Sequence, residues 1–281
     1  MGAIAHWWGN RTTLQRILVL VGLLWVIAAI IFVLTRGPAP EAGIYSIAAG
    51  GGDPSFITEG NEPAWSPDGS TILLTSEDDE GVSGIYMLEI GGSEATFVTN
   101  GASPDWSPDG SSIVFAGEDA EGNISIYTID AGGGEAVFLT DGDSPSWSPD
   151  GATIALGTSE DAETPGIYLF DLESSEVIFL TDGDNPAWSP DGSVIAFVGE
   201  NANGGSDIYT IDLESSEVTF VTGGDDPVWS PDGTTLAMTG AAEVSSAVYT
   251  VEPGSEPIMI TPGGQPTWSP DGSQLAYVQD G

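Results

Sequence analysis

Carboxylates are the residues of this chain that could carry out chemistry. The sequence has 281 residues, and all 43 of its aspartates and glutamates follow Arg36. No lysine, arginine, histidine or cysteine follows that residue, and His6 precedes it. A Ser-His-Asp triad, a Cys-His pair, a histidine zinc site and an arginine clamp for phosphate therefore cannot be built there. What remains is carboxylate chemistry, assisted by tyrosine and serine.

Paired carboxylates hydrolyse glycosides when two of them stand apart from the rest as acid and base. The acidic residues of this chain recur with a repeat, described below, and no such pair stands out. We therefore expect a protein that is not an enzyme and has no catalytic residues. Calcium is the one cofactor left open, because it takes oxygen ligands from carboxylates. Its candidate ligands are Asp141, Asp143, Asp182 and Asp184, in two Asp-Gly-Asp runs that lack EF-hand spacing.

A repeated pentapeptide, Trp-Ser-Pro-Asp-Gly, reveals the elements that must position these acids. It occurs six times, with spacings of 41, 41, 41, 41 and 39 residues between its tryptophans. These tryptophans are Trp65, Trp106, Trp147, Trp188, Trp229 and Trp268. A period near 40 is typical of one four-stranded propeller blade.

The pattern within one repeat favours strands. Residues 104–140 contain short β-branched and aromatic runs, separated by glycine, proline, aspartate and serine, with no helical spacing. The sequence Ser107-Pro108-Asp109-Gly110 predicts a type I turn, since proline presets φ and glycine accepts the positive φ at the exit. We expect the preceding tryptophan to pack between neighbouring blades.

The phase of the repeat predicts how the ring closes. The chain enters at Gly43 with the third strand of a unit and leaves near Val278 after the second strand of another. Those two halves complete one blade, and a ring closed by both termini leaves no free sheet edge at the seam. The fold class is therefore all-β, a six-bladed β-propeller closed by strands from both termini.

The unit PxWSPDGxxIAF…IYxIDLxxxxxxxLT resembles the repeat of TolB-like β-propellers and of the propellers in prolyl-oligopeptidase-type enzymes. The resemblance covers about residues 43–281 and implies a six-bladed propeller that receives peptide segments at its channel mouth. Two departures limit what it implies. We expect no α/β domain before the propeller and no hydrolase domain, because the residues outside 43–281 do not fit either.

The N-terminal region is expected to anchor the chain in a membrane. Residues 17–34 form an uninterrupted apolar run of 18, about 27 Å long as a helix at ~1.5 Å per residue. A cleaved signal peptide is the alternative, but its apolar core would be shorter and would end in small residues. The sequence predicts a cytoplasmic tail at 1–16, a transmembrane helix at 17–35, a linker at 36–42 and the propeller at 43–281.

The positive charges orient this span. Arg11 and Arg16 precede it and only Arg36 follows, so the N-terminus should stay in the cytoplasm and the propeller should be periplasmic or extracellular. A domain with no cation of its own repels nucleic acid and anionic lipid. Its carboxylates must face water, bind metal ions or meet a partner with a basic surface.

Propeller topology places the variable acids at one end. The loops between second and third strands share that end with the connections between blades, where innermost strands begin. We expect a partner-binding acidic face and channel mouth there, formed by Glu62, Asp78, Asp79, Asp119, Asp143, Asp161, Asp184, Asp225 and Asp226.

The sequence predicts a membrane-anchored, exported interaction module, an accessory or scaffolding subunit of a membrane complex. The alternative is a stand-alone surface or periplasmic protein that binds Ca²⁺ or another ligand. A carboxylate hydrolase is a more distant third.

Overall fold

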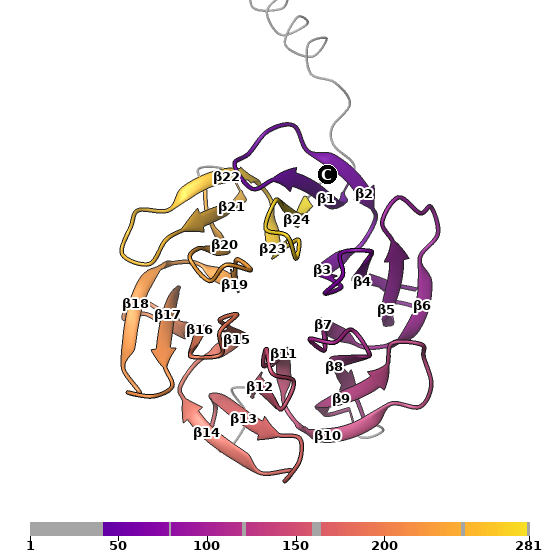
Figure 1. Cartoon of the computed structure of the whole chain (residues 1–281), viewed down its shortest axis with the longest axis horizontal. Coiled ribbons are helices and arrows are strands. Elements are labelled where there is room, and N and C mark those ends of the chain that lie inside the picture. The colour runs from indigo at the N-terminus through magenta and orange to yellow at the C-terminus, as the bar shows by residue number, and fades with distance from the viewer. Residues whose placement is uncertain (1–41, 79, 120–121, 159–163, 243–244, 280–281) are drawn as a thin grey trace, which may run out of the picture. The chain divides into compact units, whose positions relative to one another are not determined.

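The computed structural model describes residues 42–78, 80–119, 122–158, 164–242 and 245–279. Within these ranges, 24 strands form six four-stranded antiparallel sheets, which surround a central axis in Figure 1. The predicted six-bladed β-propeller is thereby confirmed. The predicted tail and transmembrane helix lie outside the described residues, as does the linker apart from Ala42. Within the part that is described, no helix has the length and hydropathy needed to cross a bilayer.

The four strands of a blade run from the axis to the rim. The innermost strands are β3 (Asn61–Trp65), β7 (Ala102–Trp106), β11 (Asp143–Trp147), β15 (Asp184–Trp188), β19 (Asp225–Trp229) and β23 (Gly264–Trp268). The second strands are β4 (Thr71–Glu77), β8 (Ser112–Glu118), β12 (Thr153–Gly157), β16 (Val194–Glu200), β20 (Leu236–Ala241) and β24 (Gln274–Gln279). The third strands are β5 (Ser83–Glu89), β9 (Ile124–Asp130), β13 (Ile167–Asp171), β17 (Ser206–Asp212), β21 (Ser246–Val251) and β1 (Gly43–Ala48). The outermost strands are β6 (Thr96–Asn100), β10 (Val137–Asp141), β14 (Val177–Thr181), β18 (Val218–Gly223), β22 (Ile258–Pro262) and β2 (Ser55–Thr58).

We name the blades in chain order: A (β3–β6), B (β7–β10), C (β11–β14), D (β15–β18), E (β19–β22) and F (β23, β24, β1, β2). Blade F joins the two ends of the propeller sequence. Its strands β1 and β24 pair antiparallel from Gly43 opposite Gln279 to Ala48 opposite Gln274. The predicted closure of the ring by both termini is confirmed.

The core lies between adjacent blades, because the second and third strands present apolar side chains on both faces of each sheet. One cluster combines Leu73 and Ile85 of blade A with Trp106, Ile113 and Phe115 of blade B. Trp106 is buried, and its indole N–H donates to the Ala64 carbonyl of blade A at 3.3 Å. The predicted packing of a pentapeptide tryptophan between blades holds at this position.

The pentapeptide forms the predicted turn, and its serine and aspartate side chains are hydrogen-bonded within it. Gly110 has φ of 70° and donates its N–H to the Ser107 carbonyl at 2.8 Å. Asp109 accepts from the Ser107 hydroxyl at 2.8 Å and from the Ser111 N–H at 2.9 Å. The Ser107 hydroxyl in turn accepts from the Ser112 N–H at 2.9 Å. The turn therefore positions the second strand directly after the first.

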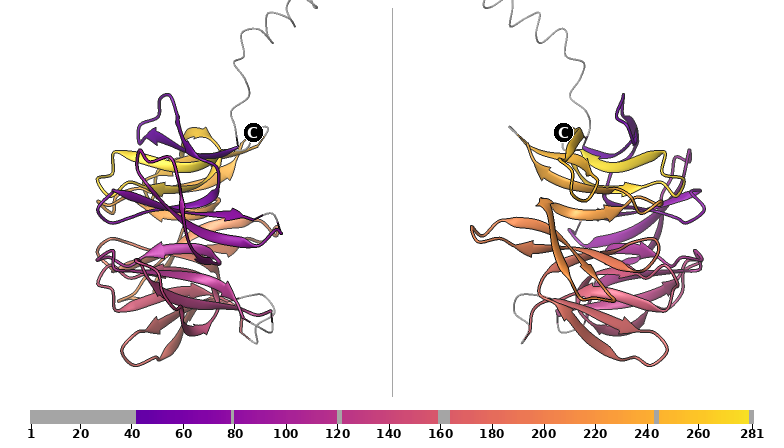
Figure 2. Two further views of the ribbon diagram at one scale, coloured as in Figure 1. Left: turned by 90° about the vertical axis from the view of Figure 1, so that its right-hand side faces the viewer. Right: turned by 60° about the vertical axis from the view of Figure 1, so that its left-hand side comes forward.

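Two faces result, and Figure 2 shows the ring from its side with loops at both of them. We call the face that carries the pentapeptide turns the turn face. We call the opposite face, where the innermost strands begin, the mouth face.

Candidate functional site

A cavity of about 370 Å³ lies at the axis where the innermost strands begin. The residues that line it include, from every blade, the second residue of the innermost strand and the proline that follows. These pairs are Glu62-Pro63, Ser103-Pro104, Ser144-Pro145, Asn185-Pro186, Asp226-Pro227 and Gln265-Pro266. The cavity is therefore built from one repeated position, filled by different side chains.

All six residues before these prolines adopt the left-handed backbone conformation, which residues other than glycine rarely adopt. We call them the mouth ring. Their φ values are 47° at Glu62, 49° at Ser103, 47° at Ser144, 48° at Asn185, 49° at Asp226 and 50° at Gln265. The recurrence of this conformation in every blade makes it a property of the scaffold.

Three backbone N–H groups of the mouth ring are bound by the aspartate that precedes them. Ser144 donates to Asp143 Oδ1 at 2.6 Å, and Asn185 donates to Asp184 Oδ1 at 2.8 Å. Asp226 donates in the same way to Asp225 Oδ1 at 3.0 Å.

The other three N–H groups are bound by side chains of an adjacent blade. Ser103 donates to Glu62 Oε2 at 2.9 Å, and Glu62 donates to Gln265 Oε1 at 3.1 Å. Gln265 donates to Thr239 Oγ1 at 2.9 Å. All six backbone donors are thus occupied by protein oxygens. The mouth ring therefore offers a ligand no free backbone N–H, and its charged side chains, Glu62 and Asp226, only accept hydrogen bonds when ionised, so a cationic ligand fits it better than an anion.

The pKa values of two carboxylates reflect this crowding of acids. Burial raises the pKa of Asp226, and the charges of Asp225 and Glu62 add to that effect, whereas the Thr239 hydroxyl, 2.8 Å from Oδ2, opposes it. Burial also raises the pKa of Asp184, with contributions from the charges of Asp143 and Asp225. The Asp184 residue is exposed as a whole, but its carboxylate contacts Gly157. A bound cation would relieve this repulsion and would lower both pKa values.

A third carboxylate with a raised pKa belongs to Asp105, which lies two residues after the mouth-ring residue Ser103 on the innermost strand β7. Its Oδ1 accepts from the Trp106 N–H at 2.9 Å, and its Oδ2 accepts from the Trp147 N–H of blade C at 2.8 Å. Part of the residue is accessible, whereas the carboxyl group is enclosed by packed atoms, and burial raises its pKa to about 6. Asp105 therefore joins blades B and C.

The predicted partner-binding residues separate into groups. Glu62, Asp143 and Asp226 line the central cavity, and Asp225 accepts from Asn185 Nδ2 beside it at 3.3 Å. Asp184 lines a second cavity of about 900 Å³ between blades C and D. The remaining described acids, Asp78 and Asp119, lie in loops on the mouth face and accept backbone N–H groups of their own loops. Asp79 and Asp161 lie outside the described residues.

The predicted calcium ligands are not brought together as one set. Asp182 and Asp184 line the second cavity, and Asp143 lines the first. Asp141 accepts from the Ser125 hydroxyl at 3.3 Å. Among the described residues, no three histidine, cysteine or acidic side chains form a group that could hold a metal ion. Calcium binding stays a prediction.

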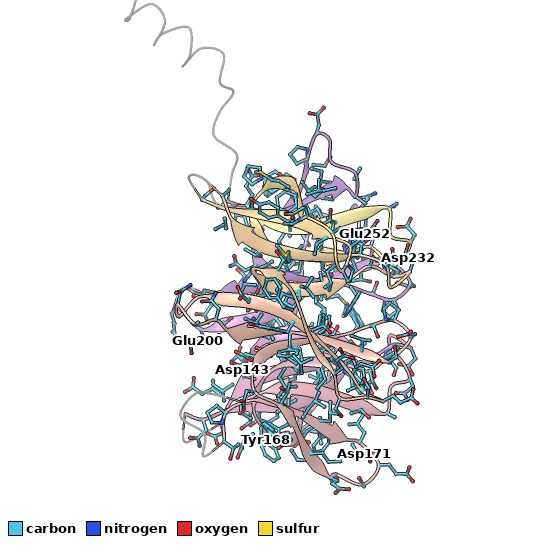
Figure 3. All side chains as sticks on the ribbon, turned by 90° about the vertical axis from the view of Figure 1, so that its left-hand side faces the viewer. Asp143, Tyr168, Asp171, Glu200, Asp232 and Glu252 are labelled. Carbon is cyan, nitrogen blue, oxygen red and sulfur yellow. The ribbon has the colours of Figure 1, made fainter. Side chains whose placement is uncertain are left out.

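Four mouth-ring residues, Ser103, Ser144, Asn185 and Gln265, were not predicted from the sequence. Sequence reasoning selected acids, and these side chains are neutral. The signal that could have found them is positional, since each precedes the proline of a Pro-x-Trp sequence. The turn face also carries acids. In the side view of Figure 3, Glu200 lies at the mouth face, and Asp171, Asp232 and Glu252 lie toward the turn face.

Comparison with known proteins places this architecture in a family. A family model described as the TolB beta propeller domain matches residues 137–281. No curated protein matches in sequence. A solved structure assigned as TolB from Agrobacterium tumefaciens has 26% identity and a TM-score of 0.74, over 86% of this chain and 99% of that one.

Two further solved structures share the fold. TolB from Acinetobacter baumannii has 20% identity and a TM-score of 0.65, over 90% of this chain and 67% of that one. The β-propeller domain of the Trilobed protease from Pyrococcus furiosus has 18% identity and a TM-score of 0.53, over 80% of each chain. With the repeat, the closed ring and the family match in agreement, this chain belongs to the TolB beta propeller family.

Proposed function

We propose that this protein is a membrane-anchored, exported interaction module whose channel mouth receives a cationic segment of a partner protein. It acts as a non-catalytic accessory or scaffolding subunit of a membrane complex. The observation that carries this proposal is the mouth ring, because its six backbone donors are already bound by protein oxygens. A lysine, arginine or terminal amine brings the positive charge and charged donors that such a site lacks.

Charge supports the same partner chemistry. No lysine or arginine follows Arg36, so the carboxylates of Glu62, Asp143 and Asp226 have no cation within the propeller sequence. A partner's positive charge would interact in a partly enclosed cavity, where screening by water is weaker than on an open surface.

Membrane attachment is proposed from the sequence. The apolar run at 17–34 is long enough to span a bilayer, and the arginines before it favour a cytoplasmic N-terminus. The propeller is then exported, as a periplasmic or extracellular domain. A non-catalytic role is proposed because the propeller sequence has no histidine, cysteine, lysine or arginine, and because no pair of its carboxylates stands apart from the repeat as acid and base.

The subunit role can be tested on the native particle. Membranes from the source cells are extracted with a mild detergent, and the mass and composition of the particle containing this chain are measured. We expect a defined stoichiometric assembly with at least one partner that has a basic segment. A particle containing this chain alone would contradict the proposal and would favour a stand-alone binder.

A further inference from the structure

The outermost strand of blade C, β14, has an unusual surface. Its outer edge has no strand partner within the described sheets. Three consecutive apolar side chains are exposed on it: Val177 at 44%, Ile178 at 52% and Phe179 at 44%. No other described outermost strand exposes three apolar residues in a row. Phe179 packs edge-on against Tyr168 at 5.3 Å between ring centroids, and Leu180 packs against the core. The surface accessible to a partner is therefore the exposed part of Val177–Phe179 together with the free edge of the strand.

Natural proteins protect such edges with lysine, proline or inward-pointing charges, because an open edge pairs with other strands. Strand β14 has none of these within its five residues, Val177–Thr181. The outermost strand of blade E, β22, is by contrast bounded by Pro257 and Pro262. In β18 of blade D, the position equivalent to Ile178 is Thr219, which is polar.

Acids stand at both ends of the β14 segment, Glu176 before it and Asp182 after it. If two copies of this chain paired in register through β14 in antiparallel fashion, Glu176 of each copy would face Asp182 of the other. Parallel pairing in register would place Glu176 opposite Glu176, and Asp182 opposite Asp182, of the other copy. Like charges placed opposite each other destabilise a strand pair, and the propeller sequence has no cation to compensate them. The edge is therefore unfavourable for self-association.

The same charges favour a strand of opposite charge. We propose that β14 binds an extended apolar segment of a partner protein by strand addition, with lysine or arginine flanking that segment opposite Glu176 and Asp182. The partner's backbone would pair with the free edge, and its apolar side chains would cover Val177, Ile178 and Phe179. This surface lies at the rim of the ring (Figure 1), so its use is independent of the channel mouth.

The test uses the full chain in phosphatidylcholine nanodiscs and a fluorescein-labelled peptide, Arg-Val-Thr-Val-Thr-Val-Arg. Fluorescence anisotropy gives its Kd for the unaltered chain and for two variants, Ile178→Glu and Thr219→Glu. The variants add the same charge at the same strand position in neighbouring blades. We expect Ile178→Glu to weaken binding about tenfold and Thr219→Glu about twofold or less, since an exposed charge alone contributes little.

Two further peptides separate strand addition from apolar adhesion. One has glutamate in place of both arginines, and the other is N-methylated at its five inner residues. We expect both to bind about tenfold more weakly or worse, because the first loses charge complementarity and the second loses its backbone donors. Hydrogen exchange should show slower exchange at β14 amides when the basic peptide is bound.

Four results would each overturn the proposal: no binding of the basic peptide at ~1 mM, equal effects of the two variants, undiminished binding of the N-methylated peptide, or no protection of β14. A fifth result would also overturn the proposal: a mouth variant, Glu62→Gln with Asp143→Asn and Asp226→Asn, loses binding of the basic peptide, whereas Ile178→Glu retains it. That outcome would place the peptide in the channel mouth. Thermal unfolding of Ile178→Glu checks its fold, and the hydrogen-exchange result stands without any variant.

Discussion

The carboxylate of Asp105 in blade B accepts a hydrogen bond from the backbone N–H of Trp147 in blade C, at 2.8 Å. The same carboxylate accepts from the N–H of its own neighbour Trp106 at 2.9 Å, so one side chain holds two innermost strands. The equivalent positions in the other blades carry alanine, serine, valine or threonine. The carboxylate that links blades B and C therefore has no counterpart at the equivalent positions of the other blades.

This link should make stability depend on pH. Burial raises the pKa of Asp105 from 3.8 to about 6 in the folded protein. A raised carboxyl pKa means that the folded state favours the protonated form. Its contribution to stability is therefore fully present below pH ~4 and is lost as pH rises through 6. Relative to Asp105→Asn, we expect the wild-type free energy of unfolding to fall by on the order of 2 kcal/mol between pH 4 and pH 7. Urea titrations at both pH values measure it, and parallel pH profiles would refute the role of Asp105.

The pentapeptide turn should have the opposite pH dependence. The Ser111 N–H and the Ser111 and Ser107 hydroxyls lower the pKa of Asp109 to about 2. The contribution of this aspartate is present above pH ~4 and is lost as pH falls through 2. We expect Asp109→Asn to lower the thermal midpoint at pH 6 and to reduce the further loss between pH 4 and pH 2. Differential scanning calorimetry measures both, and an unchanged midpoint at pH 6 would show that the carboxylate does not stabilise the turn.

Thr239 should stabilise the mouth more than its repeat equivalent does. Its hydroxyl donates to Asp226 Oδ2 at 2.8 Å and accepts from the Gln265 N–H of blade F at 2.9 Å. Thr75 has the same position in blade A, with no comparable side-chain hydrogen bond among the described residues. We expect Thr239→Val to cost about 1–3 kcal/mol, because it leaves a donor and an acceptor unpaired, and Thr75→Val to cost about 1 kcal/mol or less. Equal values from urea unfolding would argue against the bridge.

The tryptophans should differ in what their indole N–H contributes. Trp106 donates to the Ala64 carbonyl at 3.3 Å, whereas the buried Nε1 of Trp188 has no hydrogen-bond partner among the described residues. Replacing each by phenylalanine removes similar apolar volume but a hydrogen bond only at Trp106. We expect Trp106→Phe to destabilise by about 1 kcal/mol more than Trp188→Phe. Denaturant unfolding of the two variants gives the difference, and a larger loss for Trp188→Phe would reverse this assignment.

The sequence was sufficient for the fold because its repeat is strong. The pentapeptide combines a turn with a packing tryptophan, so spacing alone gave the number of blades and the shared closing blade. The packing of the tryptophan between blades followed from the repeat, but the individual hydrogen bonds between blades did not. That Asp105 reaches Trp147, or that Thr239 reaches Gln265, depends on how adjacent sheets are rotated about the axis.

The candidate site was predicted only in part for a related reason. Charge selected Glu62, Asp143 and Asp226, which line the cavity. The left-handed conformation of the mouth ring, which turns its backbone donors toward protein oxygens, has no signature in residue type, since glutamate, serine, asparagine, aspartate and glutamine all adopt it. The exposure of β14 was likewise hidden, because Val-Ile-Phe-Leu-Thr is also typical of a buried strand.

The most direct test of the proposed mouth is binding of a cationic peptide by charge-matched variants. Anisotropy of fluorescein-labelled hexa-arginine is measured with the full chain in phosphatidylcholine nanodiscs at ~0.15 M salt, where surface attraction is screened. The mouth variant combines Glu62→Gln, Asp143→Asn and Asp226→Asn. The control combines Glu173→Gln, Glu214→Gln and Glu252→Gln, which removes the same charge from exposed residues. We predict at least about a tenfold loss of affinity for the mouth variant and about twofold or less for the control. Equal losses would mean that the peptide senses only net charge, and would contradict a specific cationic site at the mouth.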